Sequence, residues 1–304
     1  MDADFSSYPS NPRKSASKNF FFPLKSEEPK GESMATTTGL VDINAGKLYY
    51  EVAGEGQPLV LIHGGLVNSG LWDDQFEVFA QHQRVVRYDV RGFGKSAAPT
   101  HPYSNHADLK ALLDFLSIDT AAVLGLSMGG AIAIDFTLTN PKRVAALIPV
   151  AAGLGGYQFD AAPALQTEMR AAYDRGDKAR AAEISLQMWT DGPNRTPDQV
   201  DPLVRERIRA MTLHMFELPD TDPDYRQQLD PPAVLRLKEI HVPTLFVVGD
   251  QDVRGILDIA DLIVKDVPGA RMAIIPGTAH HLNMEKPAEF NQIVLDFLNS
   301  LGSS

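Results

Sequence analysis

The chain has 304 residues, 44% of them hydrophobic and 22% charged, and its formal net charge at pH 7 is −11. This length allows a sizeable buried core in one large or two ordinary domains, while the negative charge argues against nucleic-acid partners and against attraction to anionic membranes. The absence of cysteine excludes disulfides, thiolate nucleophiles and thiolate metal sites, and no apolar run reaches the roughly 20 residues that span a bilayer.

Residues 1–38 differ in composition from the rest of the chain. They are rich in Ser, Pro, Lys and Glu, show no periodicity and contain one apolar cluster at residues 20–22, so we predict a disordered N-terminal extension. The cluster is too short for a secretory signal, and the acidic residues argue against a transit peptide. Met34 is a candidate original start of the protein, whereas a docking segment built on the Phe cluster is the alternative.

The first predicted strands follow this extension. Alternating hydrophobicity over residues 40–43 and 47–52 predicts a hairpin of edge strands, and the continuous apolar run 59–62 predicts a strand buried on both faces. That strand ends in the sequence His-Gly-Gly-Leu at residues 63–66, where the bare glycine backbone can present an N–H to an anion. We expect His63 itself to be a structural residue that bonds loop backbone.

A predicted helix at residues 72–81 leads to a strand at 84–88 and then to a loop with the pattern D-x-R-G-x-G-x-S. We interpret this loop as structural, with Asp89 and Arg91 paired to hold it. The amphipathic segment 106–116 predicts a packing helix.

The G-x-S-x-G pattern at residues 125–129 lies between a buried apolar run and a helical segment. A serine on such a tight strand-to-helix turn is exposed at the edge of a sheet, and glycines two residues away avoid collision with neighbouring backbone. The following helix directs free N–H groups at that hydroxyl, which favours a developing oxyanion. Ser127 is therefore the candidate nucleophile, and the N–H groups of Met128 and Gly65 are candidate oxyanion donors, with Leu66 as the alternative second donor.

An apolar run at residues 144–150 predicts a further strand, after which the alternation of strands and helices stops. Helical patterns follow one another at about 164–175, 178–189, 196–216 and 223–237 with no strand between them. We therefore predict an α/β fold with a mostly parallel sheet and helices on both faces, formed by residues 39–156 and 240–304, and an all-helical cap formed by residues 157–239. We expect the apolar residues of this cap to be mainly helix-packing core, although some of them must line the pocket. These residues are Met188, Trp189, Met211, Met215 and Phe216.

Polar residues follow both strands predicted after the cap. The strand at 243–248 ends in the sequence Gly-Asp-Gln-Asp, which gives two candidate acids, Asp250 and Asp252, and helical spacing follows at 258–265. The strand at 271–275 is followed by His280 and His281, and a closing helix is predicted at 287–298. A serine nucleophile needs a base within hydrogen-bond reach, and that base needs a carboxylate to hold its tautomer. Ligands bind beyond the carboxyl ends of such strands, so these groups can meet there.

Five motifs taken in order resemble the α/β-hydrolase fold superfamily: H-G-G at residue 63, D-x-R-G-x-G-x-S at 89, G-x-S-x-G at 125, G-D-x-D at 249, and G-x-x-H at 277 followed by E-x-P at 285. The resemblance covers residues 40 to 301. It implies Asp252 as the acid with Asp250 positioning its loop, His280 as the base with His281 facing elsewhere, and oxyanion N–H groups on Gly65 and Met128. Many relatives carry a bulky residue where Gly65 stands, so this glycine widens the pocket floor.

The resemblance implies a cofactor-free and metal-free hydrolase that cleaves an ester, lactone or related acyl bond, or a C–C bond, of a small apolar molecule through an acyl-enzyme. A serine at residue 127 argues against dehalogenases and epoxide hydrolases, which use an aspartate there. We expect Leu66, Trp189 and Met215 to contact the substrate. The alternatives are a receptor-like protein with slow hydrolysis and a cofactor-free perhydrolase. We expect a cytoplasmic protein, and the sequence leaves its oligomeric state open.

Overall fold

The computed structural model describes residues 35–159, 162–219 and 221–302, so most of the predicted N-terminal extension lies outside the described residues. Its predicted boundary at residue 38 is wrong. Thr37 and Thr38 already belong to the first strand, where they pair with Val52 and Glu51.

Eight strands form one sheet in the spatial order β1-β2-β4-β3-β5-β6-β7-β8. The first two strands pair antiparallel and β2 also pairs antiparallel with β4, whereas the six strands from β4 to β8 are parallel. Only β1 of the predicted edge hairpin is therefore an edge strand. The bounds are β1 Thr37–Ile43, β2 Gly46–Ala53, β3 Pro58–Ile62, β4 Arg84–Tyr88, β5 Ala121–Leu126, β6 Val144–Val150, β7 Leu245–Gly249 and β8 Arg271–Ile275.

The central strands are apolar along their whole length because helices cover both faces of the sheet. Every residue of β5 and of β7 is buried. Helix α1 packs with α8 and α9, and α2 packs with α3, which confirms the predicted α/β class. The bounds are α1 Asp73–Ala80, α2 Asn105–Phe115, α3 Met128–Thr139, α7 Arg254–Asp266, α8 Leu282–Glu285 and α9 Pro287–Leu301.

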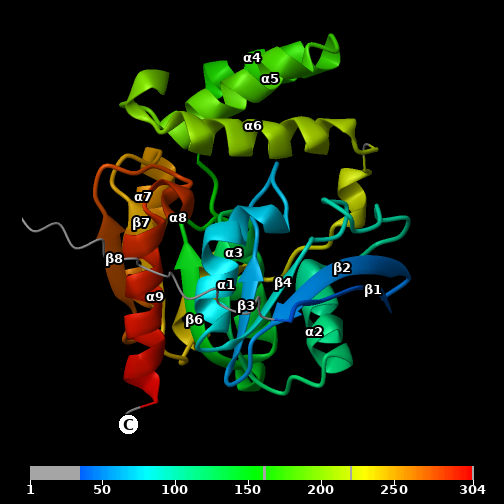
Figure 1. Cartoon of the computed structure of the whole chain (residues 1–304), viewed down its shortest axis with the longest axis vertical. Helices are drawn as coiled ribbons and strands as arrows, with labels where there is room; N and C mark the ends of the chain where they lie inside the picture. The colour runs from blue at the N-terminus through cyan, green and yellow to red at the C-terminus, as the bar shows by residue number, and fades with distance from the viewer. Residues whose placement is uncertain (1–34, 160–161, 220, 303–304) are drawn as a thin grey trace, which may run out of the picture. The chain divides into compact units, whose positions relative to one another are not determined.

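The segment between β6 and β7 contains no strand among its described residues. It holds α4 Pro163–Asp174, α5 Lys178–Ser185, a π-helix at Leu186–Asp191 and α6 Pro202–Glu217. Figure 1 shows α4 and α5 packed on the far side of α6 from the sheet. These helices have a small apolar core of their own, which is separate from the main core and consists of Ala172, Ala181, Ala182, Ile184 and Phe216.

The predicted helix at residues 223–237 is wrong. The structure has three single 3-10 turns there, at Pro223–Tyr225, Ala233–Leu235 and Leu237–Glu239. Pro231 and Pro232 stand in the middle of the predicted helix, and proline both lacks a backbone N–H and disfavours helical geometry at the residue before it. The apolar spacing in this segment therefore does not produce an α-helix.

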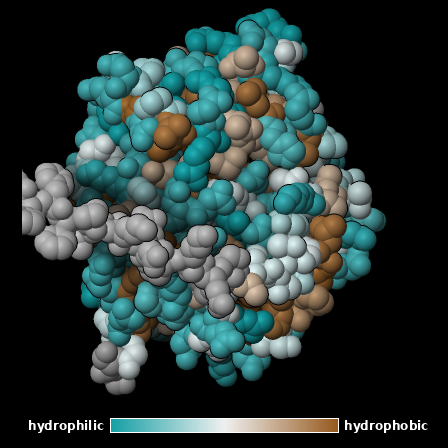
Figure 2. Space-filling view, in the orientation of Figure 1, coloured by the Kyte–Doolittle hydropathy of each residue, from teal (hydrophilic) through white to brown (hydrophobic). Residues whose placement is uncertain are grey.

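The described surface is mainly hydrophilic on the face shown in Figure 2, where apolar residues form small separate groups. The large apolar side chains that are most exposed lie on different elements: Leu40, Phe115, Leu203, Leu235 and Ile274. In the part of the chain that the structure describes, no helix has the length and apolar character needed to cross a membrane.

Candidate active site

Ser127 occupies the turn between β5 and α3 with φ 55° and ψ −112°, a backbone conformation that is strained for a residue with a side chain. Its N–H donates to the carbonyl of Val150 at 2.9 Å. A Cβ at Gly125 would overlap the carbonyl of Gly129, and a Cβ at Gly129 would overlap the carbonyl of Ile62. The two glycines are therefore required by the close packing of this turn.

The backbone N–H groups of Gly65 and Met128 are the candidate oxyanion donors. Among the described residues, neither N–H has a hydrogen-bond acceptor, and both residues line the same cavity as Ser127. Met128 is also the first residue of α3, where N–H groups are free and the helix dipole favours negative charge. An oxyanion on a group attached to Ser127 would find these donors available.

His280 and Asp252 form a buried pair beyond the ends of β8 and β7. The Nδ1 atom of His280 lies 2.8 Å from Oδ2 of Asp252, and the N–H of Val253 donates to Oδ1 of Asp252 at 2.7 Å. The two side chains are 5% and 1% exposed. The indole of Trp189 lies against the imidazole with ring centroids 4.6 Å apart. The carboxylate thus fixes one nitrogen of the imidazole and leaves Nε2 for other partners.

Ser127 and His280 line one cavity of about 220 Å³. No hydrogen bond joins their side chains in the described structure. Such contacts are often long without a substrate and shorten in the reacting complex. The arrangement can supply a nucleophile, a base and oxyanion donors to one bound carbonyl group.

The loops that carry this pair are held by further polar contacts. Asp250 accepts the N–H of Gly277 at 2.6 Å, which agrees with its predicted role in positioning the loop. Glu285 accepts the N–H of Ala279, next to His280, at 2.9 Å. Arg195 of the helical insertion pairs with Glu285 and donates to the carbonyl of Gly277 at 2.8 Å. The position of His280 therefore depends on both parts of the chain.

His63 is structural, as predicted. Its Nδ1 donates to the carbonyl of Gly64 at 2.7 Å and its Nε2 accepts the N–H of Val90 at 2.9 Å, and burial lowers the pKa of this imidazole. Both ring nitrogens are occupied by backbone groups, so His63 has no free nitrogen for acid–base chemistry.

The predicted pairing of Asp89 with Arg91 is wrong. Arg91 instead forms a buried pair with Asp108 of α2 at 2.6 Å. Asp89 accepts backbone N–H groups of Ser69 and Lys95, each at 2.8 Å. The loop is still held by these two side chains, but each of them has other partners.

His281 lines the same cavity as His280, so our prediction that it faces elsewhere is wrong. Its Nδ1 lies 3.1 Å from Oγ1 of Thr190. Burial, with a smaller effect from His280, lowers the pKa of His281 to about 3. This imidazole is therefore neutral at physiological pH and can bind neutral polar groups.

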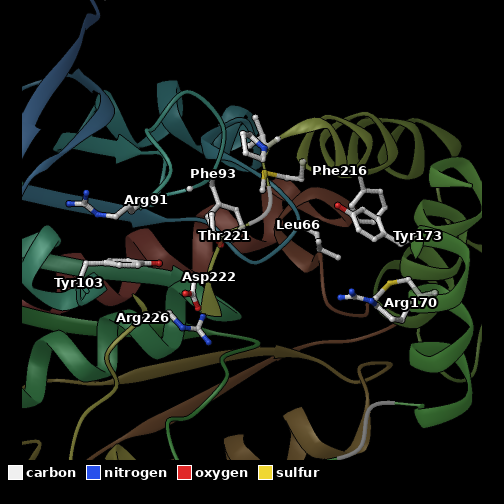
Figure 3. Close-up of a pocket in the computed structure, with 15 residues that line it drawn as sticks. Leu66, Arg91, Phe93, Tyr103, Arg170, Tyr173, Phe216, Thr221, Asp222 and Arg226 are labelled. Atoms are coloured by element: carbon white, nitrogen blue, oxygen red, sulfur yellow. The ribbon is translucent and has the colours of Figure 1, made fainter. Parts of the chain in front are cut away.

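The three expected substrate contacts do not share one cavity. Leu66 and Trp189 line the cavity of Ser127, but Met215 lines a separate cavity of about 440 Å³. Figure 3 shows that second cavity, with Leu66 near Phe216 and Tyr173, and with Asp222 near Arg226. Leu66 belongs to the walls of both cavities, so it stands between them.

Sequence reasoning missed Arg195, Thr190 and Thr212 near the site. All three lie in the helical insertion, and no motif or spacing in that segment marks them. Within the described ranges, no group of three or more His, Asp or Glu side chains could hold a metal ion.

The sequence matches the family model described as alpha/beta hydrolase fold over residues 57–287. A relative from Paraburkholderia phymatum, named 2-hydroxy-6-oxononadienedioate/2-hydroxy-6-oxononatrienedioate hydrolase, is 28% identical over 87% of this chain and 96% of its own length. A solved structure described as an N-acyl homoserine lactone degrading enzyme has a TM-score of 0.68 and 27% identity, covering 85% of this chain and 100% of that one. The structure of carboxylesterase CesB (YbfK) from Bacillus subtilis has a TM-score of 0.69 and 25% identity, covering 88% of this chain and 92% of that one.

Proposed function

The chain belongs to the alpha/beta hydrolase fold family, and from this premise we propose that it cleaves an ester, lactone or related acyl bond of a small molecule through an acyl-enzyme on Ser127. The observation that carries the proposal is the buried His280–Asp252 contact of 2.8 Å beside a cavity that Ser127 also lines. The similarity to proteins named as a carboxylesterase, a lactone-degrading enzyme and a 2-hydroxy-6-oxononadienedioate hydrolase supports hydrolysis of this kind in general.

In the proposed reaction the Ser127 oxygen attacks the substrate carbonyl carbon and its proton passes to Nε2 of His280. Asp252 keeps the proton of the imidazole on Nδ1 and stabilises the imidazolium that forms. The N–H groups of Gly65 and Met128 donate to the oxyanion. His280 then protonates the leaving group, and a water molecule deprotonated by the same imidazole hydrolyses the acyl-enzyme, which restores the Ser127 hydroxyl.

The helical insertion is proposed as the cap of this site. Trp189 and Ile208 of the insertion line the cavity together with residues of the sheet's loops. Covering the reacting groups excludes bulk water, which strengthens the electrostatic interactions within the site.

Replacing Ser127 with alanine tests the proposal. We expect S127A to lower kcat/KM for p-nitrophenyl acetate and butanoate by about 10³-fold or more, because the nucleophile and its covalent intermediate are lost. The measurement is steady-state release of p-nitrophenol, with mass spectrometry to detect an acyl adduct on residue 127 in the wild type.

S300A is the matched control, because Ser300 lies on α9 and its hydroxyl bonds only the carbonyl of Phe297. We expect this variant to keep wild-type turnover. Turnover by S127A at the wild-type rate would refute the assignment of the nucleophile. A single turnover followed by arrest in the wild type would favour the receptor-like alternative over an enzyme.

A further inference from the structure

The cavity beside Ser127 has a second set of polar side chains besides the proposed catalytic groups. Ser185 and Thr212 contribute from the helical insertion, and His281 contributes from the loop after β8. All three residues are at most 5% exposed. A cavity for which we expected a small apolar substrate therefore also has polar side chains on its wall that the proposed reaction does not use.

The hydroxyl of Thr212 on α6 makes no hydrogen bond within the described chain, unlike the hydroxyls of three other threonines on α-helices. The hydroxyls of Thr137, Thr139 and Thr167 each donate to the backbone carbonyl four residues earlier, at 2.8, 2.8 and 2.9 Å. The buried hydroxyl of Thr212 has no hydrogen-bond partner in the described structure. Because leaving a buried hydroxyl unpaired is unfavourable, a bound molecule that supplies a partner would be favoured at this wall.

His281 offers a second polar contact at the same cavity. Thr190 occupies its Nδ1, and no described residue bonds its Nε2. Since the imidazole is neutral, one nitrogen is a donor and the other an acceptor, and the Thr190 hydroxyl can match either tautomer. Nε2 is thus available to a neutral group that can donate or accept.

We propose that Thr212 and His281 bind a hydroxyl group that the substrate carries close to its scissile carbonyl, so that hydroxy-substituted esters and lactones are the preferred substrates. This inference rests on the proposed acyl chemistry at Ser127. A hydroxyl both donates and accepts, so it suits Thr212 and either tautomer of His281. The cavity of about 220 Å³ corresponds to about seven water volumes at roughly 30 Å³ each, which restricts the reacting part of the substrate to a small group.

The test compares ethyl butanoate with three hydroxylated esters of similar size: ethyl 2-hydroxybutanoate, ethyl 3-hydroxybutanoate and 2-hydroxyethyl butanoate. Acid release in a pH-stat gives kcat/KM for each. We expect the wild type to prefer at least one hydroxylated ester over ethyl butanoate by about tenfold or more, because the unsubstituted chain leaves the hydroxyl of Thr212 unpaired.

The variants T212V and H281F should each reduce that preference by about three- to tenfold. T212S retains the hydroxyl and should retain the preference, and T167V, on the exposed face of α4, should also retain it. Melting temperatures verify that each variant is folded, and using a ratio of two substrates removes general losses of activity.

Two results would overturn the inference. The first is a wild-type kcat/KM for ethyl butanoate that equals or exceeds its kcat/KM for every hydroxylated ester. The second is a preference for a hydroxylated ester that is unchanged in both T212V and H281F. Either result leaves the proposed function intact provided that S127A is inactive on ethyl butanoate. Activity that persists in S127A would overturn the proposed function and this inference together.

Discussion

At the residue scale, two kinds of glycine surround Ser127. Gly125 and Gly129 are required because a Cβ at either position would overlap a backbone carbonyl, and this requirement makes the G-x-S-x-G pattern informative in a sequence. Gly65 is different, because a Cβ built there meets no atom within 4 Å. The absence of a side chain at Gly65 therefore enlarges the cavity and is not required by the packing of the backbone.

Substituting Gly65 with valine should therefore narrow the cavity while leaving its N–H in place. We expect G65V to lower the ratio of kcat/KM for p-nitrophenyl butanoate to kcat/KM for p-nitrophenyl acetate by about tenfold. One or two methylene groups in a tight pocket change discrimination between substrates by about that amount. Steady-state kinetics with both esters measures the ratio. Equal losses for the two esters would indicate a displaced N–H donor instead.

The place of a residue at the end of a strand could be predicted from the sequence, whereas the neighbour that its side chain contacts could not. Ser127, Asp252 and His280 follow three strands whose carboxyl ends meet, so their order along the chain is informative. His281 was expected to face away, and Asp89 was expected to pair with Arg91. Both errors concern which neighbour a side chain contacts, and sequence spacing does not determine that in a loop.

At the scale of elements, Arg195 connects the helical insertion to the loop of His280. Its side chain and that of Glu285 are 9% and 8% exposed, and the arginine also donates to the carbonyls of Thr190 and Asp191. One guanidinium thus joins the end of the π-helix to the loop after β8. Removing one member of a buried pair leaves the other charge uncompensated.

We expect R195M to lower the free energy of unfolding by about 3 kcal/mol and to lower kcat, because the loop of His280 loses its anchor. Urea denaturation measures the first effect and ester hydrolysis the second. R254M is the control: Arg254 pairs with Asp258 at the surface and is 77% exposed, so its loss should change stability by less than about 1 kcal/mol. Similar losses in the two variants would contradict an anchoring role for Arg195.

The elements themselves were largely predictable because hydrophobic period and turn residues agree along most of the chain. The failure at residues 223–237 has a local reason, since the apolar spacing there competes with prolines at 231 and 232. Residues 226 and 103 instead form a β-bridge, a contact between distant segments that the local pattern does not contain. Local sequence patterns predict helices and strands, whereas a pairing between distant segments depends on the tertiary structure.

At the scale of the whole molecule, burial lowers the pKa of buried histidines and raises the pKa of a buried carboxyl group. His63 and His281 have lowered pKa values because burial disfavours their charged forms. Below about pH 6.5 these two imidazoles bind protons in the unfolded chain but stay neutral in the folded chain. Both therefore lower the free energy of unfolding as the pH falls below about 6.5. Asp135 of α3 has a pKa raised to about 6, mainly by burial and with a partial opposing effect from Arg236 and Arg226.

The Asp135 carboxyl should make the folded state less stable as pH rises from about 4 to about 6. In that range the folded carboxyl keeps its proton while the unfolded one ionises, and above it the buried carboxyl must carry a charge although its Oδ1 has no partner among the described residues. D135N removes this ionisation. Because one pKa unit corresponds to about 1.4 kcal/mol and the site is partly solvated, we expect D135N to exceed the wild type in unfolding free energy by about 2 kcal/mol at pH 8.

That difference should disappear below about pH 4, where the wild-type carboxyl is protonated in both states. Urea unfolding of both proteins at pH 4, 6 and 8 measures it. The two buried histidines titrate equally in both proteins, so their contribution cancels when the curves are subtracted. A difference that stays constant with pH would mean that the amide changes packing or hydrogen bonding, and that ionisation of Asp135 does not limit the stability of the fold.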